Sequence, residues 1–328
     1  MKKFVCLLMA LVMVLSMTLV ASAEGEWKFE RKIELVCPWG VGGGADGTLR
    51  PLAPLLKDIL GVEVEIVNVT GGSGATGIEY AYKQPADGYT FVLGTQSIIM
   101  LDLQGTLSMD YKNEFVPVAR LVHSINIIAA SKVAMDQKGL HNFSELKDYL
   151  EKNPYGISVG MLTATGADAA ALKQTIKDLS VMEIPYGGGS EMNSALMGGH
   201  IDLMITGTDE ISGLIASGDI LPFLALSENR MSIYPDMECS GELGIDSYIG
   251  TWRGLMAKKG TPQEAIDALN AALTQAVETE SWKTFLHNAA YDERPGFATG
   301  DEFQSFIDDE YKTFTEYLRE EGTLVKEY

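Results

Sequence analysis

The sequence predicts an α/β protein in which helices cover the faces of one or more β-sheets. Short runs of β-branched and aromatic residues alternate with amphipathic stretches of helical period, which is typical of such sheets. The chain has 328 residues, enough for two α/β lobes or one large one, and no Pro/Ser-rich linker marks a boundary. We expect strands at Ile33–Cys37, Val62–Val67, Tyr89–Leu93, Asn126–Ala130, Ile157–Gly160, Glu183–Ile184, Ile201–Ile205, Leu221–Ala225 and Arg253–Ala257.

Two of the expected helices carry start signals. Asn142 and Glu145 form a capping box, in which each residue's side chain accepts a hydrogen bond from a backbone N–H at the helix start. Thr261, Pro262 and Glu264 suit the N-cap, first and third positions of another helix. Both signals predict helices that begin at these residues.

Apolar residues recur at helical spacing in two C-terminal stretches, at Ile266, Leu269, Leu273 and Val277, and at Phe303, Phe306, Ile307, Phe314, Tyr317 and Leu318. We expect both faces, including the aromatic residues of the second, to pack in the core. An earlier helix contains Pro51, which suits a first turn, and Pro54, which should kink the helix or delay its start.

The N-terminus predicts export. Lys2 and Lys3 precede an apolar run at 4–20, and Ala21-Ser22-Ala23 has the small-x-small pattern of a cleavage site. Residues 1–23 therefore read as a signal peptide that is removed after about Ala23. The alternative is a membrane anchor, but a run of 17 residues is short for a span. We expect a soluble protein in the periplasm or another extracytoplasmic compartment.

The composition excludes some classes of partner. The formal charge is −20, or −22 once Lys2 and Lys3 are removed, which argues against nucleic acid. The four histidines are scattered and no Cys/His cluster exists, so no metal site or cofactor is expected. Cys37 lies in a predicted buried strand; it and Cys239 are expected to be two buried thiols, with a disulfide as the alternative.

Four Gly/Thr/Ser-rich loops follow predicted strands, at 38–47, 70–77, 94–97 and 162–168. The carboxyl ends of strands line the ligand crevice of open α/β sheets, so these loops should converge. Their backbone N–H groups, hydroxyls and helix N-termini suit the oxygens of a carboxylate or phosphate. In the first loop, Asp46 or Thr48 could be the N-cap of the next helix. The alternative is that each loop is only a turn with N-cap chemistry.

Two glycine patterns also invite a dinucleotide interpretation. Gly40–Ala45 fits G-x-G-x-x-A and Gly72–Gly77 fits G-x-G-x-x-G. The first has Pro38-Trp39 between strand and glycines, and neither has an acid at the end of the following strand. No G-x-S-x-G elbow or Cys-His pairing is present either, so we expect no enzyme activity. The alternative of another class is an exported α/β hydrolase that acts on a carboxylate.

Six motifs, in order along the mature chain, resemble those of the extracytoplasmic solute receptors of tripartite tricarboxylate transporters, also called Bug receptors. The family patterns are VVPFPPGGGTD, NRPGAGG, DGYTLLLGT, VPYKG, GGQVDLM and WxGLFAPAGTP. Their counterparts here are Ile33–Asp46, Asn68–Gly74, Asp87–Thr95, Ile184–Gly188, Gly198–Met204, and Trp252–Leu255 with Gly260–Pro262.

The resemblance implies a two-lobed periplasmic binding protein fold (type II, Venus flytrap) with two crossover strands. Lobe 1 would comprise 24–125 plus 250–328, and lobe 2 would comprise 126–249. The ligand-binding residues it implies are Trp39, Gly42, Gly43, Gly44, Ala45, Asp46, Gly74, Thr95, Gln96, Ser97, Leu162, Thr163, Ala164, Thr165, Tyr186, Thr206, Gly207 and Thr208.

The resemblance also implies a function. A monomeric receptor would capture a small organic carboxylate between its lobes and deliver it to a two-component membrane permease driven by an ion gradient. A ligand sensor for a membrane kinase is an alternative that uses the same fold and site.

Three departures from the family pattern bear on specificity. Trp39-Gly40 replaces Phe-Pro, which puts a larger aromatic side chain near the ligand or between the lobes. Serine donors of the second lobe are partly lost, with Thr163 and Thr165 as substitutes. Thr206 stands where many relatives carry an acid that would suit an amino group, which favours a ligand without one.

Overall fold

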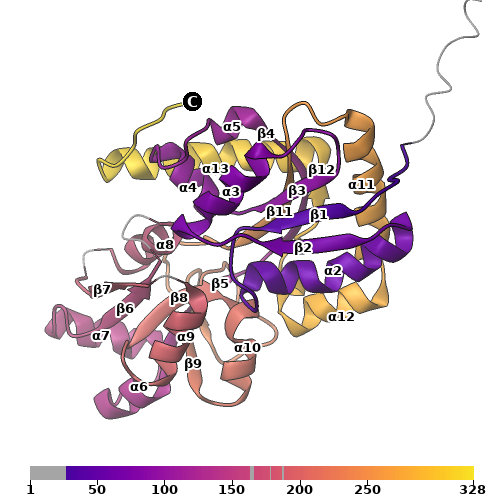
Figure 1. Ribbon diagram of the computed structural model, residues 1–328. Coiled ribbons are helices and arrows are strands. Elements are labelled where there is room, and N and C mark those ends of the chain that lie inside the picture. The colour runs from indigo at the N-terminus through magenta and orange to yellow at the C-terminus, as the bar shows by residue number, and fades with distance from the viewer. Residues whose placement is uncertain (1–26, 163–165, 178, 187) are drawn as a thin grey trace, which may run out of the picture.

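The computed structural model describes residues 27–162, 166–177, 179–186 and 188–328. The predicted signal peptide at 1–23 lies outside the described residues, and so do Thr163, Ala164 and Thr165. Two six-stranded mixed sheets each lie between layers of helices, so that the molecule has two lobes (Figure 1).

The first sheet has the strand order β12-β4-β11-β3-β1-β2. Its core is parallel, because β1 pairs with both β2 and β3, and Leu35 lies opposite Ile66 on one side and Phe91 on the other. Strand β11 runs antiparallel to both β3 and β4. The strands are β1 (Ile33–Cys37), β2 (Val64–Asn68), β3 (Thr90–Gly94), β4 (Phe115–His123), β11 (Trp252–Lys258) and β12 (Ala298–Thr299).

Helices cover both faces of this sheet. One face packs against α2 (Gly44–Leu60), α11 (Gln263–Val277) and α12 (Glu280–Asn288). The other packs against α3 (Ala75–Lys83), α4 (Gln96–Leu103) and α13 (Gly300–Glu320). Short elements complete the lobe: α5 (Tyr111–Glu114), η1 (Gly72–Gly74) and η2 (Tyr291–Glu293).

The second sheet has the order β10-β9-β5-β8-β6-β7, again with parallel strands (β6, β7 and β8) beside an antiparallel β5. The strands are β5 (Asn126–Ser131), β6 (Ser158–Met161), β7 (Met182–Pro185), β8 (Leu203–Gly207), β9 (Ile220–Ala225) and β10 (Glu238–Cys239). Helices α6 (Lys132–Lys138), α7 (Phe143–Lys152) and α8 (Ala167–Ile176) cover one face, and α9 (Gly189–Met197) and α10 (Thr208–Ala216) cover the other.

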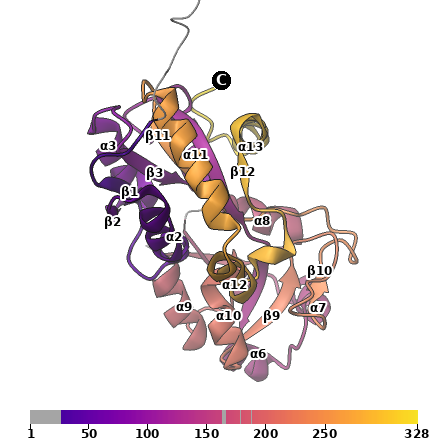
Figure 2. The ribbon, with the colours of Figure 1, turned by 90° about the vertical axis from the view of Figure 1, so that its right-hand side faces the viewer.

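The chain passes between the sheets twice, first from β4 to β5 and then from β10 to β11 (Figure 2). The two crossings are bonded to each other, since the Ser124 amide donates to the Thr251 carbonyl over 2.8 Å. Each crossing delivers an antiparallel strand into the middle of the sheet it enters, β5 into the second and β11 into the first. Both connections therefore lie side by side at the junction of the lobes.

All nine predicted strands are confirmed, with ends displaced by at most two residues. Three strands are absent from the prediction: β4, β10 and β12. Strand β4 is the longest of them and contains Pro117, which counts against a strand in the middle of a sheet. The sheet accommodates it by an irregularity, because the register between β11 and β4 shifts at Leu255/Met256 and Met256 is the partner of Pro117.

The capping box at α7 is confirmed, because the Glu145 amide donates to Asn142 Oδ1 over 2.8 Å. The aromatic face of α13 is also confirmed as core, with Phe303 and Phe314 fully buried. The start of α11 is wrong by one residue: Pro262, rather than Thr261, is the N-cap. The reason is the extended backbone of Pro262 (ψ 131°), which places this residue before the first helical turn.

The prediction for α2 is also wrong at its start. The helix begins at Gly44 with Gly43 as N-cap, so neither Asp46 nor Thr48 is the N-cap and Pro54 does not delay the start. Pro54 is exposed, where water can satisfy the backbone carbonyl that a proline leaves without a donor. The helix consequently reaches the glycine loop without interruption.

The predicted buried thiols are confirmed, since Cys37 and Cys239 are both free and buried. Burial raises the pKa of Cys37 to about 11, so its thiol is protonated at neutral pH. Within the described ranges, no helix has the length and apolarity needed to cross a membrane. Over the same ranges, no three His, Cys, Asp or Glu side chains are grouped to hold a metal ion.

Candidate ligand-binding site

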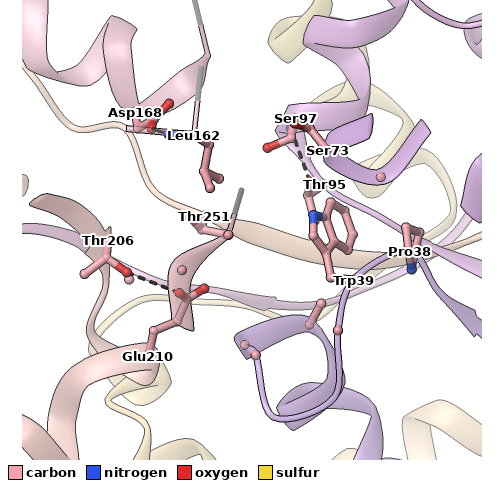
Figure 3. A pocket seen from close by; sticks show the side chains of 18 of the residues that line it. Pro38, Trp39, Ser73, Thr95, Ser97, Leu162, Asp168, Thr206, Glu210 and Thr251 are labelled. Atoms are coloured by element: carbon pink, nitrogen blue, oxygen red, sulfur yellow. Dashed lines mark hydrogen bonds between the residues drawn. The ribbon is translucent and has the colours of Figure 1, made fainter. Parts of the chain in front are cut away.

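A cavity of about 410 Å³ lies between the lobes and is lined from both. Figure 3 shows the two sides, with Trp39, Ser73, Thr95 and Ser97 from the first lobe facing Leu162, Asp168, Thr206 and Glu210 from the second. The structure brings eleven of the predicted residues to this lining: Trp39, Gly43, Gly44, Ala45, Gly74, Thr95, Gln96, Ser97, Leu162, Thr206 and Gly207. That they touch a ligand stays a prediction.

Six helices start at the cavity, α2, α3 and α4 from the first lobe and α8, α9 and α10 from the second. Each contributes a lining residue at its N-cap or in its first turn. A helix N-terminus has unpaired N–H groups and a partial positive charge of roughly +0.5, which together favour an anion. Only α4 is capped by its N-cap side chain (Thr95); the N-caps of the other five are glycines without a side chain, at Gly43, Gly74, Gly166, Gly188 and Gly207.

The second glycine loop has a backbone that explains its composition. The four residues from Gly71 to Gly74 all have positive φ, and Ser73 adopts it (φ 54°) although it is not a glycine. At Gly74 a Cβ would also lie 2.7 Å from Ile98 and 3.0 Å from Trp39. Such a conformation is costly, and it places the start of α3 against the cavity wall.

Asp46 holds the first glycine loop (38–47) in place, and its side chain is buried in the first turn of α2. Its carboxylate accepts hydrogen bonds from the Gly42 amide (3.0 Å), from Arg50 (2.9 Å) and from Asn68 (3.0 Å). Burial by itself raises the pKa of a carboxyl group, but the bonds from Arg50 and Gly42 more than offset it, so the pKa of Asp46 is lowered. Asp46 thus remains an anion that shapes the loop.

Four predicted residues lie outside the cavity lining. Asp46 and Gly42 bond to each other behind the loop. The Tyr186 amide donates to the Met161 carbonyl at the end of β6. Thr208 is fully buried in α10, with its hydroxyl 3.4 Å from the Ala289 carbonyl of the first lobe.

Hydrogen-bonded side chains connect the third loop (94–97) to the two connections between the lobes. Gln96 Nε2 donates to the Thr251 hydroxyl over 3.1 Å, and this hydroxyl donates to Asn126 Oδ1 over 3.0 Å. All three residues line the cavity. A group bound at the start of α4 is therefore linked through two hydrogen bonds to both connections between the lobes. Sequence reasoning found Gln96 but neither partner, because they are close only in the folded chain.

An arginine that the sequence prediction did not include spans the two lobes. Arg253, on β11 of the first sheet, lies 3.0 Å from Asp209 and 2.9 Å from Glu210, both on α10 of the second lobe. It also donates to the Tyr291 hydroxyl. Arg253 and Asp209 have side chains only 3% and 5% exposed, so this is a buried ion pair. Among the described residues, Arg253 is the one basic side chain in the lining.

Two acids face the cavity, and sequence reasoning did not select either. Asp168 Oδ2 accepts from the Leu162 amide over 2.7 Å, and burial raises the pKa of Asp168 despite that bond. Glu210 accepts from Arg253 (2.9 Å) and from the Thr206 hydroxyl (3.4 Å). Burial, then the neighbouring Asp209, raise the pKa of Glu210, while Arg253 acts in the opposite direction.

Trp39 forms part of the cavity wall and also packs against the first-lobe core. Its backbone carbonyl accepts from Asn68 over 2.9 Å, in the same cluster that holds Asp46. The indole is thereby positioned by the first lobe, and Figure 3 shows it directed into the space between the lobes.

Two α/β lobes joined by two crossings, with a cavity between them, define the class of two-lobed periplasmic binding proteins. Solved structures agree. The periplasmic binding protein BugD superposes with a TM-score of 0.80 at 23% identity over 91% of this chain and all of that one. MatC of Rhodopseudomonas palustris, solved with bound malate, has a TM-score of 0.76 at 22% identity over 88% and 99%.

Within that class, the chain belongs to the tripartite tricarboxylate transporter family of receptors, whose family model matches residues 48–323. The Bordetella pertussis protein BugT is 27% identical over 90% of this chain and 91% of its own length. A solute-binding protein of this family from Polaromonas has a TM-score of 0.67 at 26% identity, over 89% of this chain and 99% of that one. The resemblance read from the six motifs is confirmed.

Proposed function

We propose that this chain is an extracytoplasmic receptor that closes its two lobes on a small organic carboxylate and carries it to a two-component, ion-gradient-driven permease. The observation that carries the proposal is the convergence of six helix N-termini, five of them capped only by glycine, on one cavity. Free N–H groups and helix dipoles can hold carboxylate oxygens without a basic side chain. Arg253 is already bonded to two acids, so little of its charge is left for a ligand.

Similar proteins support the same chemistry. One relative in fold, from Rhodopseudomonas palustris, was solved with adipate (TM-score 0.79, 24% identity), and MatC was solved with malate. Both of those ligands are small dicarboxylates. The proposal assigns binding and delivery to this chain, with no chemical conversion of the ligand.

The proposal includes the organisation inferred from the sequence. Residues 1–23 would be removed on export, 24–125 and 250–328 would form lobe 1, and 126–249 would form lobe 2 of a monomer. The relay of Gln96, Thr251 and Asn126 at the crossings offers a route from ligand contact to lobe closure.

A thermal-shift screen of the mature chain tests the binding step. Dicarboxylates, tricarboxylates, aromatic acids and amino acids would be compared with the amides of the same acids as matched controls. At a hundredfold excess over Kd, the right acid should stabilise the fold by about 2.7 kcal/mol. Its amide, which lacks the negative charge, should give no shift. If no acid raised the melting temperature and none co-purified by native mass spectrometry, the proposal would be wrong.

Delivery needs a separate test. Cells that express the two membrane subunits should take up the identified acid only when this chain is present. Uptake should stop when the ion gradient is collapsed and should persist when ATP alone is depleted. Binding without such uptake would favour the sensor alternative.

A further inference from the structure

The two walls of the cavity differ in charge. On the first-lobe side, α2, α3 and α4 present three helix N-termini, and the anionic Asp46 in the first turn of α2 lies outside the lining, paired with Arg50. On the second-lobe side, three further N-termini are accompanied by Asp168 and Glu210 in the lining, with Asp209 behind them. Arg253 can neutralise only one of these acids. Three helix ends give each wall a partial charge of roughly +1.5, so the walls differ by the acids of the second, which carries the excess of negative charge.

Hydrogen-bond donors favour the ionised form of the second-wall acids, against burial, which raises the pKa of Asp168 and of Glu210. Glu210 Oε1 accepts from Arg253, which cannot give up its proton, and Oε2 lies 3.4 Å from the Thr206 hydroxyl, which can donate to it. Asp168 receives the Leu162 amide on Oδ2 and lies in the first turn of α8. N–H donors and a helix N-terminus both favour the ionised form.

Thr206 alone suggests a ligand without an amino group, because it occupies a position where relatives carry an acid. The structure removes the basis for that reasoning. Glu210, one helical turn further on, places its carboxylate 3.4 Å from the Thr206 hydroxyl, at the cavity. An acid is therefore present at this end of β8 after all, although it comes from α10.

We infer that the ligand is a carboxylate that also carries a cationic nitrogen, such as an amino acid, bound with its carboxylate on the first-lobe wall and its nitrogen toward Asp168 and Glu210. This inference rests on the proposed function and narrows its ligand class. A plain dicarboxylate would place its second negative charge beside Asp168 and Glu210, where like charges repel. An ammonium group there gains charge-assisted hydrogen bonds instead.

Calorimetry with matched ligand pairs tests the inference. L-glutamate and glutarate, L-norvaline and pentanoate, and L-phenylalanine and 3-phenylpropanoate differ within each pair only by the amino group. In every pair that binds, the amino member should have a Kd at least about tenfold lower, as expected for one hydrogen bond to a charged group. An equal or tighter Kd for the acid without the amino group would overturn the inference and leave carboxylate binding intact. Binding by no member of any pair, together with no stabilising acid in the thermal-shift screen and none co-purified, would overturn the proposed function itself.

Variants locate the effect on the second wall. Glu210→Gln should reduce the preference for the amino member to about threefold or less, and Asp168→Asn, which loses no arginine partner, should reduce it independently. Glu242→Gln is the matched control, because Glu242 also pairs with an arginine, Arg230 at 2.7 Å, in the second lobe but away from the cavity. A preference that survives in both cavity variants, or is lost equally in Glu242→Gln, would contradict the assignment.

Discussion

Both walls of the cavity are built from the starts of helices, but they differ in the charged side chains beside those starts. The first-lobe wall uses helix starts beside glycines and uncharged side chains, and so presents bare N–H groups. The second-lobe wall uses helix starts as well, but places Asp168 and Glu210 among them. Glycine-rich loops therefore indicate where an anion can be bound, whereas side chains on the neighbouring helices determine which other groups the ligand must carry.

The largest expected effect comes from removing the arginine that joins the walls. Arg253→Met should lower the free energy of unfolding by about 3–5 kcal/mol, because it leaves Asp209 and Glu210 close together without a counter-charge. Urea unfolding measures the change. Arg230→Met is the control: its pair with Glu242 is 43% and 33% exposed, so its loss should cost about 1 kcal/mol at most. An equal loss of unfolding free energy in the two variants would show that the buried ion pair contributes no more to stability than the exposed one.

A substitution in the first glycine loop (38–47) tests carboxylate binding by the first-lobe wall alone. Gly43 lines the cavity, and a Cβ there meets nothing closer than the Gly40 carbonyl at 3.6 Å, so the fold should tolerate valine. The added methyl groups should cover the N–H groups at the start of α2 and weaken carboxylate binding at least about thirtyfold in calorimetry. Gly47→Val, in open space on the same helix, should leave affinity unchanged. Unchanged affinity in Gly43→Val would mean that the loop is only a turn.

Glu310, a buried acid of the first lobe outside the cavity lining, should make the stability of the fold depend on pH. Glu310 accepts from Trp252 Nε1 over 2.8 Å, and burial raises the pKa of Glu310 to about 7. Because its pKa is higher in the folded than in the unfolded state, its contribution to stability is full below about pH 4.5 and is lost as the pH rises through 7. Glu310→Gln should therefore gain stability relative to the wild type between pH 5 and 8, by as much as about 3 kcal/mol.

Comparing Glu310→Gln with the wild type at each pH cancels other titrating groups. One of these is His123, where burial and then Arg294 lower the pKa to about 3. Chemical unfolding at several pH values provides the measurement. A stability difference that stays constant from pH 5 to 8 would contradict a raised pKa for Glu310.

The fold was predictable to the extent that it depends on local patterns. Strand Ile33–Cys37 was placed to the residue, because it is a compact apolar run that ends in a glycine loop. Strand β4 was missed because Pro117 is tolerated only through a register shift against β11. The glycine-rich loops could likewise be assigned to the cavity. Positive φ and close packing against neighbouring atoms favour glycine, and a run of glycines can be recognised in the sequence.

The charged residues of the site were not predictable in the same way. Arg253 and Glu210 are 43 residues apart and meet only because β11 and α10 face each other across the lobes. Asp168 was visible in the sequence, but its bond to the Leu162 amide and its place in the cavity lining are contacts of the folded chain. A sequence with 45 acids offers no local signal that separates these from the surface ones.

A crystal structure of the mature chain with its identified ligand tests most directly whether the first-lobe helix starts bind a carboxylate. We expect a carboxylate between the lobes, with its oxygens about 2.7–3.1 Å from backbone N–H groups at the starts of α2 and α4, the distance typical of N–H···O hydrogen bonds. A carboxylate bound to Arg253 or beside Asp168 on the second-lobe wall, with the first-lobe N–H groups left unused, would contradict it.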